Sequence, residues 1–261
     1  MSEKYKYVYG PVSSWRLGSS LGVDLISKEE KVCTFDCSYC QIGPTKDFSD
    51  SRKIFVPTKE VLKEINSISA GNFKIDYITF SGRGEPTLAA NLGDVIEGVK
   101  KIRNEKVAVI TNSSLIDSPD VQDDLSMADL VMVKIDACSE DLFLKINKPM
   151  KKIKLSNVLE GIEEFRRGFK GKLALQIMFT EANKDHAEEL AKVAKKIKAH
   201  EIQINTPLRP SNIKPLSKKD IQAIKKYFKG MNIVTAYDAE RKNVMPVSKK
   251  ETLKRRGKRL K

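Results

Sequence analysis

The chain of 261 residues has no uninterrupted apolar run long enough to span a membrane, and its first ten residues, MSEKYKYVYG, contain no signal-peptide core. These absences argue against a membrane protein and predict a soluble, cytoplasmic one. Cysteine and histidine are scarce, with four and two residues. Because cytoplasmic thiols are kept reduced, clustered cysteines there indicate metal ligands rather than disulfides. No internal repeat or low-complexity segment precedes the C-terminal tail.

The net charge of +14 lies mainly at one end of the chain. Residues 241–261 contain ten Lys or Arg and one acid, Glu251, so this tail carries +9 and the first 240 residues only +5. A stretch of like charge is typical of a flexible arm. The charge by itself therefore indicates a basic tail rather than a generally basic protein.

Short β-branched strands alternate with amphipathic helical segments, a rhythm typical of parallel β/α units. Strands are predicted at Leu21–Ile26, 75–80, 106–111, 128–136, 173–180 and 201–207, and helices at 58–69, 91–103, 156–169, 185–199 and 217–228, with a further short helix between the third and fourth strands. Six such units with right-handed crossovers predict an α/β fold, an incomplete (β/α)6 barrel. We expect this barrel to occupy residues 1–230, and residues 231–261 to form a short C-terminal extension with the basic tail.

Polar residues interrupt the chain where the predicted strands end. The cysteines follow the first strand, SGRGEP the second and TNSS the third, and Lys134 with Asp136, Gln176 and Asn205 mark the fourth, fifth and sixth. In β/α barrels the chemistry lies at the carboxyl ends of the strands. Lys134 and Asp136 point to one face of their strand, and two charges facing a barrel interior are costly unless they are paired or functional.

Three of the four cysteines, Cys33, Cys37 and Cys40, stand in the loop 31–45 with the spacing C-x-x-x-C-x-x-C. A structural zinc site would need a fourth ligand, Cys138 or a histidine. A 4Fe–4S cube held by three cysteines leaves one iron open, which suits a reactive site. We favour the cluster, with zinc or a metal-free set of buried thiols as the alternatives.

The spacing resembles the signature of the radical S-adenosylmethionine (SAM) superfamily. The resemblance implies that the open iron binds the amino and carboxylate groups of SAM. An electron from the cluster, supplied by a donor such as ferredoxin or flavodoxin, then breaks a C–S bond of SAM. The resulting 5′-deoxyadenosyl radical abstracts hydrogen from the substrate.

Further positions match the superfamily residue by residue. Tyr39 matches an aromatic near the adenine of SAM, and Asn112 a polar residue that holds its ribose or carboxylate. Gly82, Gly84 and Glu85 in SGRGEPTL resemble a Gly-Gly-Glu motif whose backbone accepts a hydrogen bond from the amino group of SAM, and only glycine permits so close an approach. A plain turn at the glycines and a helix cap at Asn112 are the alternatives. Lys134, Asp136, Gln176 and Asn205 complete the expected SAM contacts.

Within the superfamily, YGPVSSWRLGSSLGVDLI (9–26), INKP (146–149) and INTPLRP (204–210) resemble the branch related to wyosine tRNA synthases, over about residues 7–230. The chain departs from that branch at Ser13 and Trp15, which leaves the expected SAM contacts unaffected. It also has neither a second cysteine triad nor a flavin domain, because Cys138 is its only other cysteine. Wyosine synthesis itself is therefore disfavoured, and modification of tRNA or another RNA stays open.

Two basic features bear on the substrate. Five lysines without an acid lie between Lys145 and Lys154, and the tail ends KKETLKRRGKRLK. They indicate either a solvated surface or RNA phosphate contacts, although no aromatics are interleaved to stack bases. Three hypotheses follow: a radical SAM enzyme acting on RNA, one acting on a protein or small metabolite, and a zinc-stabilised RNA-binding protein without catalysis. Cys138 fits a core or loop position, or a thiol facing the substrate.

Overall fold

The computed structural model describes residues 5–68, 74–238 and 242–256. The expected end of the first helix at Ser69 and the tail residues 257–261 lie outside these ranges. One eight-stranded sheet dominates the structure, in the order β1-β2-β5-β6-β7-β8-β9-β10. Its strands are β1 (Val8–Ser14), β2 (Gly18–Val23), β5 (Tyr77–Phe80), β6 (Lys106–Ile110), β7 (Leu130–Lys134), β8 (Lys172–Met178), β9 (Glu201–Asn205) and β10 (Ile233–Thr235).

The strands from β2 to β10 run parallel, and β1 pairs antiparallel with β2. The six predicted strands correspond to β2 and β5–β9, which confirms the expected α/β partial barrel. β1 and β10 are additional edge strands, and β10 lies within the expected C-terminal extension. β2 ends before the predicted limit at Ile26 because the Asp24 carboxylate accepts hydrogen bonds from the backbone N–H of Ile26 and Ser27, which turns the chain.

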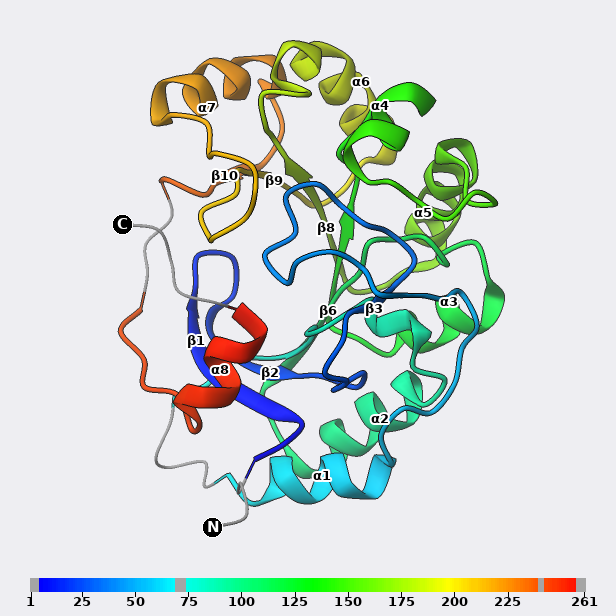
Figure 1. Cartoon of the computed structure of the whole chain (residues 1–261), viewed down its shortest axis with the longest axis vertical. Coiled ribbons are helices and arrows are strands. Elements are labelled where there is room, and N and C mark those ends of the chain that lie inside the picture. The colour runs from blue at the N-terminus through cyan, green and yellow to red at the C-terminus, as the bar shows by residue number, and fades with distance from the viewer. Residues whose placement is uncertain (1–4, 69–73, 239–241, 257–261) are drawn as a thin grey trace.

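The helices form an arc around the sheet from α1 to α7 (Figure 1). Their bounds are α1 (Thr58–Asn66), α2 (Leu92–Ile102), α3 (Pro119–Ser126), α4 (Glu140–Ile146), α5 (Leu155–Gly168), α6 (Ala187–Ile197) and α7 (Lys218–Lys225), with 3-10 turns at Pro86–Leu88, Lys184–His186 and Lys226–Phe228. Ser217 and Asp220 form a capping box at the start of α7. α4 is a helix that the sequence pattern did not predict.

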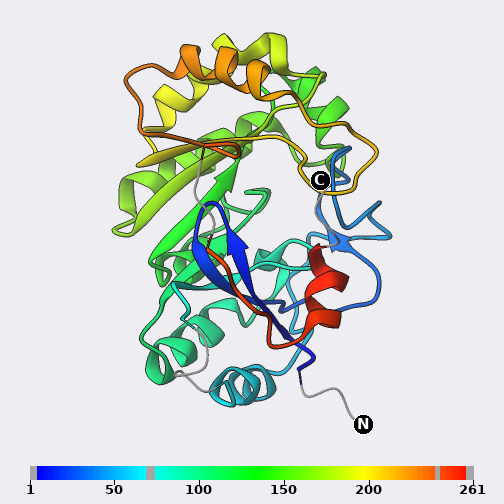
Figure 2. The same cartoon turned by 90° about the vertical axis from the view of Figure 1, so that its left-hand side faces the viewer.

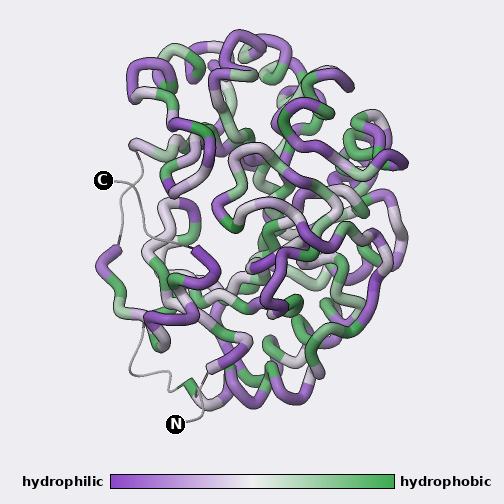
Figure 3. The backbone as a smooth tube through the Cα atoms, in the orientation of Figure 1, coloured by the Kyte–Doolittle hydropathy of each residue, from purple (hydrophilic) through white to green (hydrophobic). Residues whose placement is uncertain are grey.

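The basic tail was expected to be a flexible arm, and the structure differs from that expectation. Residues Lys249–Arg256 are not part of a flexible arm but form helix α8, which lies against β1 (Figures 1 and 2). The helix is mostly hydrophilic along its length (Figure 3). Its two buried residues are both charged, Glu251 and Arg255. The helix is therefore held by polar contacts rather than by an apolar face.

The main hydrophobic core joins the sheet to the arc of helices, and Phe80, Phe179 and Phe228 are among its fully buried side chains. Hydrophobic stretches follow the central strands in Figure 3. No helix in the described ranges has the length and apolar character needed to cross a bilayer. The core thus holds the strands in place, and the loops that follow the strands cover their carboxyl ends.

Candidate functional site

A cavity of about 310 Å³ opens at the carboxyl ends of the strands. It gathers side chains from loops that follow different strands. Eleven of the twelve residues predicted as metal ligands or cofactor contacts line it, namely Cys33, Cys37, Tyr39, Cys40, Gly82, Gly84, Glu85, Asn112, Lys134, Gln176 and Asn205. Ser13 and Trp15, the two departures from the expected branch, line it as well. Asp136 is the predicted residue that does not.

The three clustered cysteines belong to one irregular loop. Cys33 ends the short strand β3 (Val32–Cys33), which pairs with β4 (Asp47–Phe48), and a turn from Cys37 O to Cys40 N, 3.0 Å apart, carries the other two. All four cysteines are free thiols. Burial raises the pKa of Cys33 to about 12 and that of Cys37 to about 11. Both thiols therefore keep their protons at neutral pH unless a bound metal displaces them.

Amide side chains from two other loops reach these thiols. The Asn112 amide Nδ2 lies 3.5 Å from Cys33 Sγ and donates to Thr34 Oγ1 at 2.7 Å. The Asn147 amide Nδ2 lies 3.5 Å from Cys37 Sγ. Hydrogen bonds to a ligating sulfur tune an iron–sulfur centre, and they also fix the position of the loop. The sequence predicts that Asn112 binds SAM, and in this structure its amide contacts the cysteine loop.

Lys31 supplies a buried positive charge beside the thiols. Its Nζ donates to Gly43 O at 3.3 Å and lies 3.8 Å from the Asp36 carboxylate. Burial opposes the charge on Lys31, but the neighbouring cysteine sulfurs, that of Cys40 foremost, favour the charged form and raise its pKa. The residue was missed in sequence analysis, although a lysine two positions before the first cysteine was a usable signal.

Asp136 lies beneath the cavity and organises the residues above it. Its carboxylate accepts hydrogen bonds from the Tyr39 hydroxyl, from Asn147 Nδ2 at 2.8 Å and from Met178 N at 2.7 Å. Lys134 Nζ lies 3.5 Å from the same carboxylate and 4.9 Å from the centre of the Tyr39 ring. Asp136 was predicted to contact the cofactor. Its place in the structure is one layer further in, where it positions Tyr39 and Lys134.

The glycines of SGRGEP are required by chain packing. A Cβ on Gly84 would lie 1.9 Å from Val32 O, and one on Gly82 would lie 2.2 Å from the Asp24 Cγ. Glu85 N donates to the same Val32 carbonyl at 3.2 Å, so this loop is paired with the strand that carries Cys33. Sequence analysis attributed both glycines to the approach of a ligand. The structure adds a direct reason: a side chain on Gly84 would push the SGRGEP loop away from β3, and one on Gly82 would displace the Asp24 side chain.

Glu85 joins the loops after β5 and β6. Its buried carboxylate accepts hydrogen bonds from Thr87 N, Thr87 Oγ1, Thr111 Oγ1 and Asn112 N at 2.6–3.1 Å. Burial raises the pKa of this carboxyl, and the four donors counteract that rise. The carboxylate is thus fully engaged with the protein, and Glu85 shapes the cavity wall that holds Asn112.

Gln176 and Asn205 bring the last two strands to the cavity. Gln176 Nε2 donates to Gln203 Oε1 at 3.3 Å, and Asn205 Oδ1 accepts from Thr206 N at 2.9 Å. Neither histidine lines the cavity, nor does Cys138, which packs half-buried against the main core. None of these three residues therefore supplies this cavity with the fourth ligand that a zinc site would need.

The described ranges contain no three His, Cys, Asp or Glu side chains close enough together to hold a single metal ion. In an iron–sulfur cube each thiolate binds a different iron, so the three sulfurs need to face one space rather than meet at one point. The lining of the cavity by all three cysteines meets that condition. The donor set fits a cluster better than a mononuclear site.

Segment 146–150 pairs with the cysteine loop, an arrangement that sequence analysis missed. Ser38 N donates to Ile146 O at 2.9 Å, Asp36 N to Lys148 O at 3.1 Å and Met150 N to Thr34 O at 3.0 Å. This pairing places Asn147 next to Cys37. The INKP stretch, which contains Asn147, matched the expected branch, but the spacing of residues along the chain could not predict that it pairs with the cysteine loop.

The comparisons with known proteins agree with this geometry. The family model of the radical SAM superfamily matches residues 31–194. A UPF0026 protein of Synechocystis is 40% identical over 220 residues, which cover 84% of this chain and 81% of that protein. A UPF0026 protein of Methanocaldococcus jannaschii is 37% identical over 223 residues, with 84% and 68% covered.

Among solved structures, SuiB of Streptococcus suis bound to S-adenosylmethionine superposes with a TM-score of 0.62 at 14% sequence identity. The match covers 79% of this chain and 48% of SuiB, so the chain corresponds to about half of that protein. At this identity the likeness concerns the fold, a partial barrel. With the family match spanning the cysteine loop and four of the strand-end loops, the chain belongs to the radical SAM superfamily and is related within it to the UPF0026 proteins.

Proposed function

We propose that this chain is a radical SAM enzyme with a single 4Fe–4S cluster held by Cys33, Cys37 and Cys40. SAM would occupy the adjoining cavity. When bound, the reduced cluster supplies the electron that cleaves SAM to methionine and a 5′-deoxyadenosyl radical, which abstracts hydrogen from the substrate. One observation carries the proposal: the three cysteines and all the residues expected to contact SAM except Asp136 line the same cavity.

The chain's own residues prepare this site. Asn112, Asn147 and Lys31 lie beside the thiols, and Asp136 holds Tyr39 and Lys134 in place. We propose that Tyr39 contacts the adenine and that Lys134 binds the carboxylate of SAM, since a partly neutralised cation on the cavity wall suits a single carboxylate.

The decisive experiment is anaerobic reconstitution with iron and sulfide, followed by reduction in the presence of SAM. We expect about four iron and four sulfide per chain, and slow release of 5′-deoxyadenosine and methionine even without substrate. Ferredoxin or flavodoxin should replace the chemical reductant. Protein that takes up stoichiometric zinc and no iron under these conditions would contradict the proposal and favour a zinc-stabilised binding protein.

RNA is a candidate substrate of this enzyme. The five lysines between Lys145 and Lys154 are all exposed, and the segment that contains Lys148 pairs with the cysteine loop. Lys148 therefore lies beside the cysteine loop, and the other four lysines lie within a few residues of it along the chain. This placement supports RNA modification, and the sequence resemblance to the branch related to wyosine synthases points to the same class of substrate. A protein or small metabolite is the alternative substrate.

Binding of tRNA should be measured as a function of salt. Replacing Lys145, Lys151 and Lys154 by Gln should weaken binding and lower the salt slope by about 0.9 for each phosphate that the variant no longer neutralises. The matched control replaces the exposed Lys195, Lys218 and Lys219 by Gln. Truncation of the tail is not a clean test, because α8 belongs to the fold. No tRNA binding near physiological salt would favour the alternative substrates.

A further inference from the structure

Asn147, the C-cap residue of α4, is a buried polar residue for which sequence analysis gave no role. It is only 4% exposed. Its amide Nδ2 donates to Asp136 Oδ2 at 2.8 Å and lies 3.5 Å from both Cys37 Sγ and Tyr39 Oη. One side-chain amide therefore contacts a proposed cluster ligand and the carboxylate that holds Tyr39 in place.

Asp136 decides which way this amide faces. A carboxylate only accepts hydrogen bonds, so the nitrogen of the Asn147 amide, and not its oxygen, must face Asp136. Among the described residues the buried Asn147 Oδ1 has no hydrogen-bond partner. The amide is thus oriented by the contacts of its nitrogen, and its oxygen is left unsatisfied.

The amide nitrogen carries a second hydrogen, for which Cys37 Sγ and Tyr39 Oη are equally distant acceptors. The Tyr39 hydroxyl is neutral and donates its own hydrogen to Asp136. A cysteine that binds iron is a thiolate, and hydrogen bonds to charged acceptors are about twice as strong as those between neutral groups. When the cluster is bound, the second hydrogen therefore favours Cys37.

Backbone hydrogen bonds hold Asn147 beside the cysteine loop independently of its side chain. The residues before and after it, Ile146 and Lys148, both accept backbone hydrogen bonds from the loop, at 2.9 and 3.1 Å. The segment and the loop should therefore stay paired when the Asn147 side chain is changed. The amide can be removed without removing the strand-like contact that carries it.

A donor at this position acts on electron uptake. The electron that the cluster accepts adds negative charge to the cube and to the sulfurs that hold it, and hydrogen bonds to those sulfurs are among the factors that set its reduction potential. A hydrogen bond from an amide stabilises the reduced form more than the oxidised form, because the reduced form carries more negative charge. Such a donor makes the cluster easier to reduce.

We propose that Asn147 is a positioning residue that donates a hydrogen bond to Cys37 Sγ and thereby raises the reduction potential of the cluster. This inference rests on the proposed function. Asn147 does not line the cavity, so it acts through Cys37 and not on SAM or the substrate. Asp136 gains a second role, because it orients the Asn147 amide as well as the Tyr39 hydroxyl.

The test uses the full chain with a reconstituted cluster, under anaerobic conditions and without SAM, so that no bound ligand contributes to the potential. Redox titrations give the potential, with the EPR signal of the reduced cluster and the loss of its visible absorbance as two readouts. Iron and sulfide contents and melting temperatures are measured for every variant. A residue with a merely structural role would change the melting temperature but not the potential.

Asn147→Leu removes the donor and keeps a side chain of similar size. At a fixed applied potential the ratio of reduced to oxidised cluster should fall about tenfold, as the loss of one charged hydrogen bond implies. For a one-electron couple this is a shift of about 59 mV to lower potential. Asn147→Gln keeps an amide and should recover part of the shift.

Asn91→Leu is the matched control. Asn91 is buried too, its Nδ2 donates to Val56 O at 3.0 Å and to Thr58 Oγ1 at 2.9 Å, and its Oδ1 has no partner among the described residues. It does not line the cavity. The same substitution there should lower the melting temperature and leave the potential as in the wild type.

The inference is overturned if Asn147→Leu has the potential of the wild type, or if Asn91→Leu shifts it equally. Loss of the cluster from Asn147→Leu with normal iron in Asn91→Leu would also overturn it, because the amide would then hold the loop rather than set the potential. Release of 5′-deoxyadenosine by the wild type with SAM is measured in parallel. A wild type that binds the cluster but releases no product contradicts the proposed function, whereas normal release with an unshifted Asn147→Leu refutes the role of Asn147 alone.

Discussion

At the scale of single residues, each cavity thiol has a different polar neighbour. Cys33 has Asn112, Cys37 has Asn147, and Cys40 has Lys31. Asn112 and Asn147 come from two other parts of the chain, whereas Lys31 belongs to the cysteine loop itself. The cysteine loop has only the two-residue strand β3 of its own, so these contacts determine where its thiols lie.

The first prediction concerns the ligands. Cys33→Ala, Cys37→Ala and Cys40→Ala should each abolish the brown cluster. A 4Fe–4S cube with one open iron is held by three thiolates, so the loss of any one leaves the cube with too few protein ligands. Iron and sulfide analysis after anaerobic reconstitution measures this loss. Cys138→Ala is the control, since Cys138 packs outside the cavity. Retention of a full cluster in any of the first three variants would refute the ligand assignment.

The second prediction concerns Gly84. Gly84→Ala should lower iron content as well as SAM binding, because its Cβ would meet the Val32 carbonyl, one residue before Cys33. The control is Gly168→Ala, at the end of α5, where a Cβ has no neighbour within 4 Å. If Gly84→Ala kept normal iron and lost only SAM, the glycine would serve ligand approach, as first predicted from the sequence.

The third prediction is a pH dependence. The Tyr7 hydroxyl donates to Glu60 Oε2 at 2.5 Å, and this hydrogen bond raises the pKa of Tyr7 from 10.0 to about 12. A raised folded-state pKa stabilises the protein below the unfolded value, and the contribution is lost as pH rises through the folded one. Glu60→Gln should return the pKa of Tyr7 toward 10.0.

Phenolate absorbance measures this shift, with Tyr7→Phe as the reference that lacks the group. The difference in the free energy of unfolding between wild type and Glu60→Gln should diminish between about pH 10 and pH 12. An unchanged titration in Glu60→Gln would show that Glu60 is not the cause.

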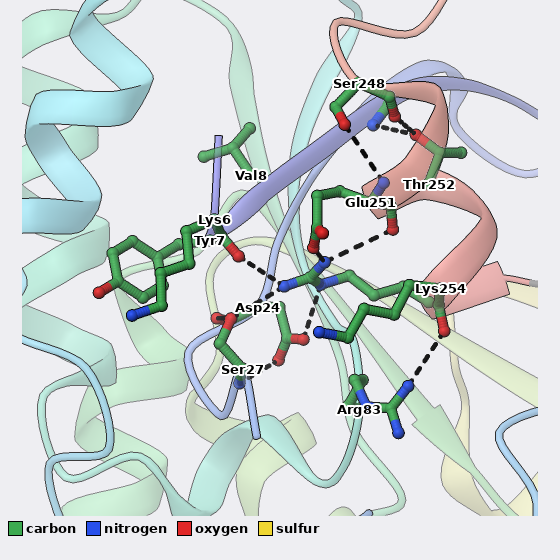
Figure 4. A network of polar contacts seen from close by, with 12 residues as sticks. Lys6, Tyr7, Val8, Asp24, Ser27, Arg83, Ser248, Glu251, Thr252 and Lys254 are labelled. Atoms are coloured by element: carbon green, nitrogen blue, oxygen red, sulfur yellow. Dashed lines mark hydrogen bonds and ion pairs between the residues drawn. The ribbon is translucent and has the colours of Figure 1, made fainter. Parts of the chain in front are cut away.

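At the scale of elements, α8 is held by an ion-pair network rather than by an apolar face. The Arg255 guanidinium donates to Asp24 at 2.8 Å and to Glu251, with all three side chains buried. Arg83 Nη1 donates to Lys254 O at 3.2 Å. Figure 4 shows Asp24, Ser27, Lys6 and Glu251 around this network, and Arg83 beside the end of the helix. α8 is thereby tied to the SGRGEP loop, because Asp24 also packs against Gly82.

The fourth prediction tests this network. Arg255→Met leaves the buried Asp24 and Glu251 carboxylates without their partner, and breaking a buried pair in this way costs about 3–5 kcal/mol. Urea unfolding should show that loss. Lys249→Met, on the exposed first turn of α8, is the control and should change stability by less than about 0.5 kcal/mol.

A double variant sharpens the fourth prediction. Asp24→Asn together with Arg255→Met should cost less than the two single losses added, because the uncompensated Asp24 charge is then removed. Strictly additive costs would show that Asp24 and Arg255 do not interact energetically.

At the scale of the whole molecule, the cavity is formed by loops from across the sheet, from the β1–β2 hairpin to the loop after β9. A ligand that bridges these loops stabilises the folded protein as a unit. The fifth prediction is that SAM at about 100 times its Kd raises the free energy of unfolding of the cluster-loaded protein by about 2.7 kcal/mol. At about 2–4 °C per kcal/mol, the melting temperature should rise by several degrees.

The cluster-free protein is the comparison for the fifth prediction, because it lacks the expected iron contact to SAM. Its shift with SAM should be smaller. Equal shifts with and without the cluster would place SAM away from Cys33, Cys37 and Cys40.

The sequence by itself determined the strand–helix alternation, the six central strands and the superfamily. The physical reason is that hydrophobic periodicity and cysteine spacing are local properties, and parallel strands bring their carboxyl ends to one edge. Consequently, residues as distant as Cys33 and Asn205 could be assigned to one site from their positions after successive strands.

Only the tertiary structure shows what Asp136, Gly84 and α8 contact. The alternation of polar and apolar residues around Asp136 predicted that its side chain faces the cavity. Its hydrogen-bond partners, however, come from the cysteine loop, from Asn147 after α4 and from β8. The charge pattern of the tail predicted a flexible arm, because it could not reveal that Asp24, 231 positions before Arg255, is buried and pairs with that arginine. A buried carboxylate needs a counter-charge, and the basic segment supplies it by folding onto β1 as a helix.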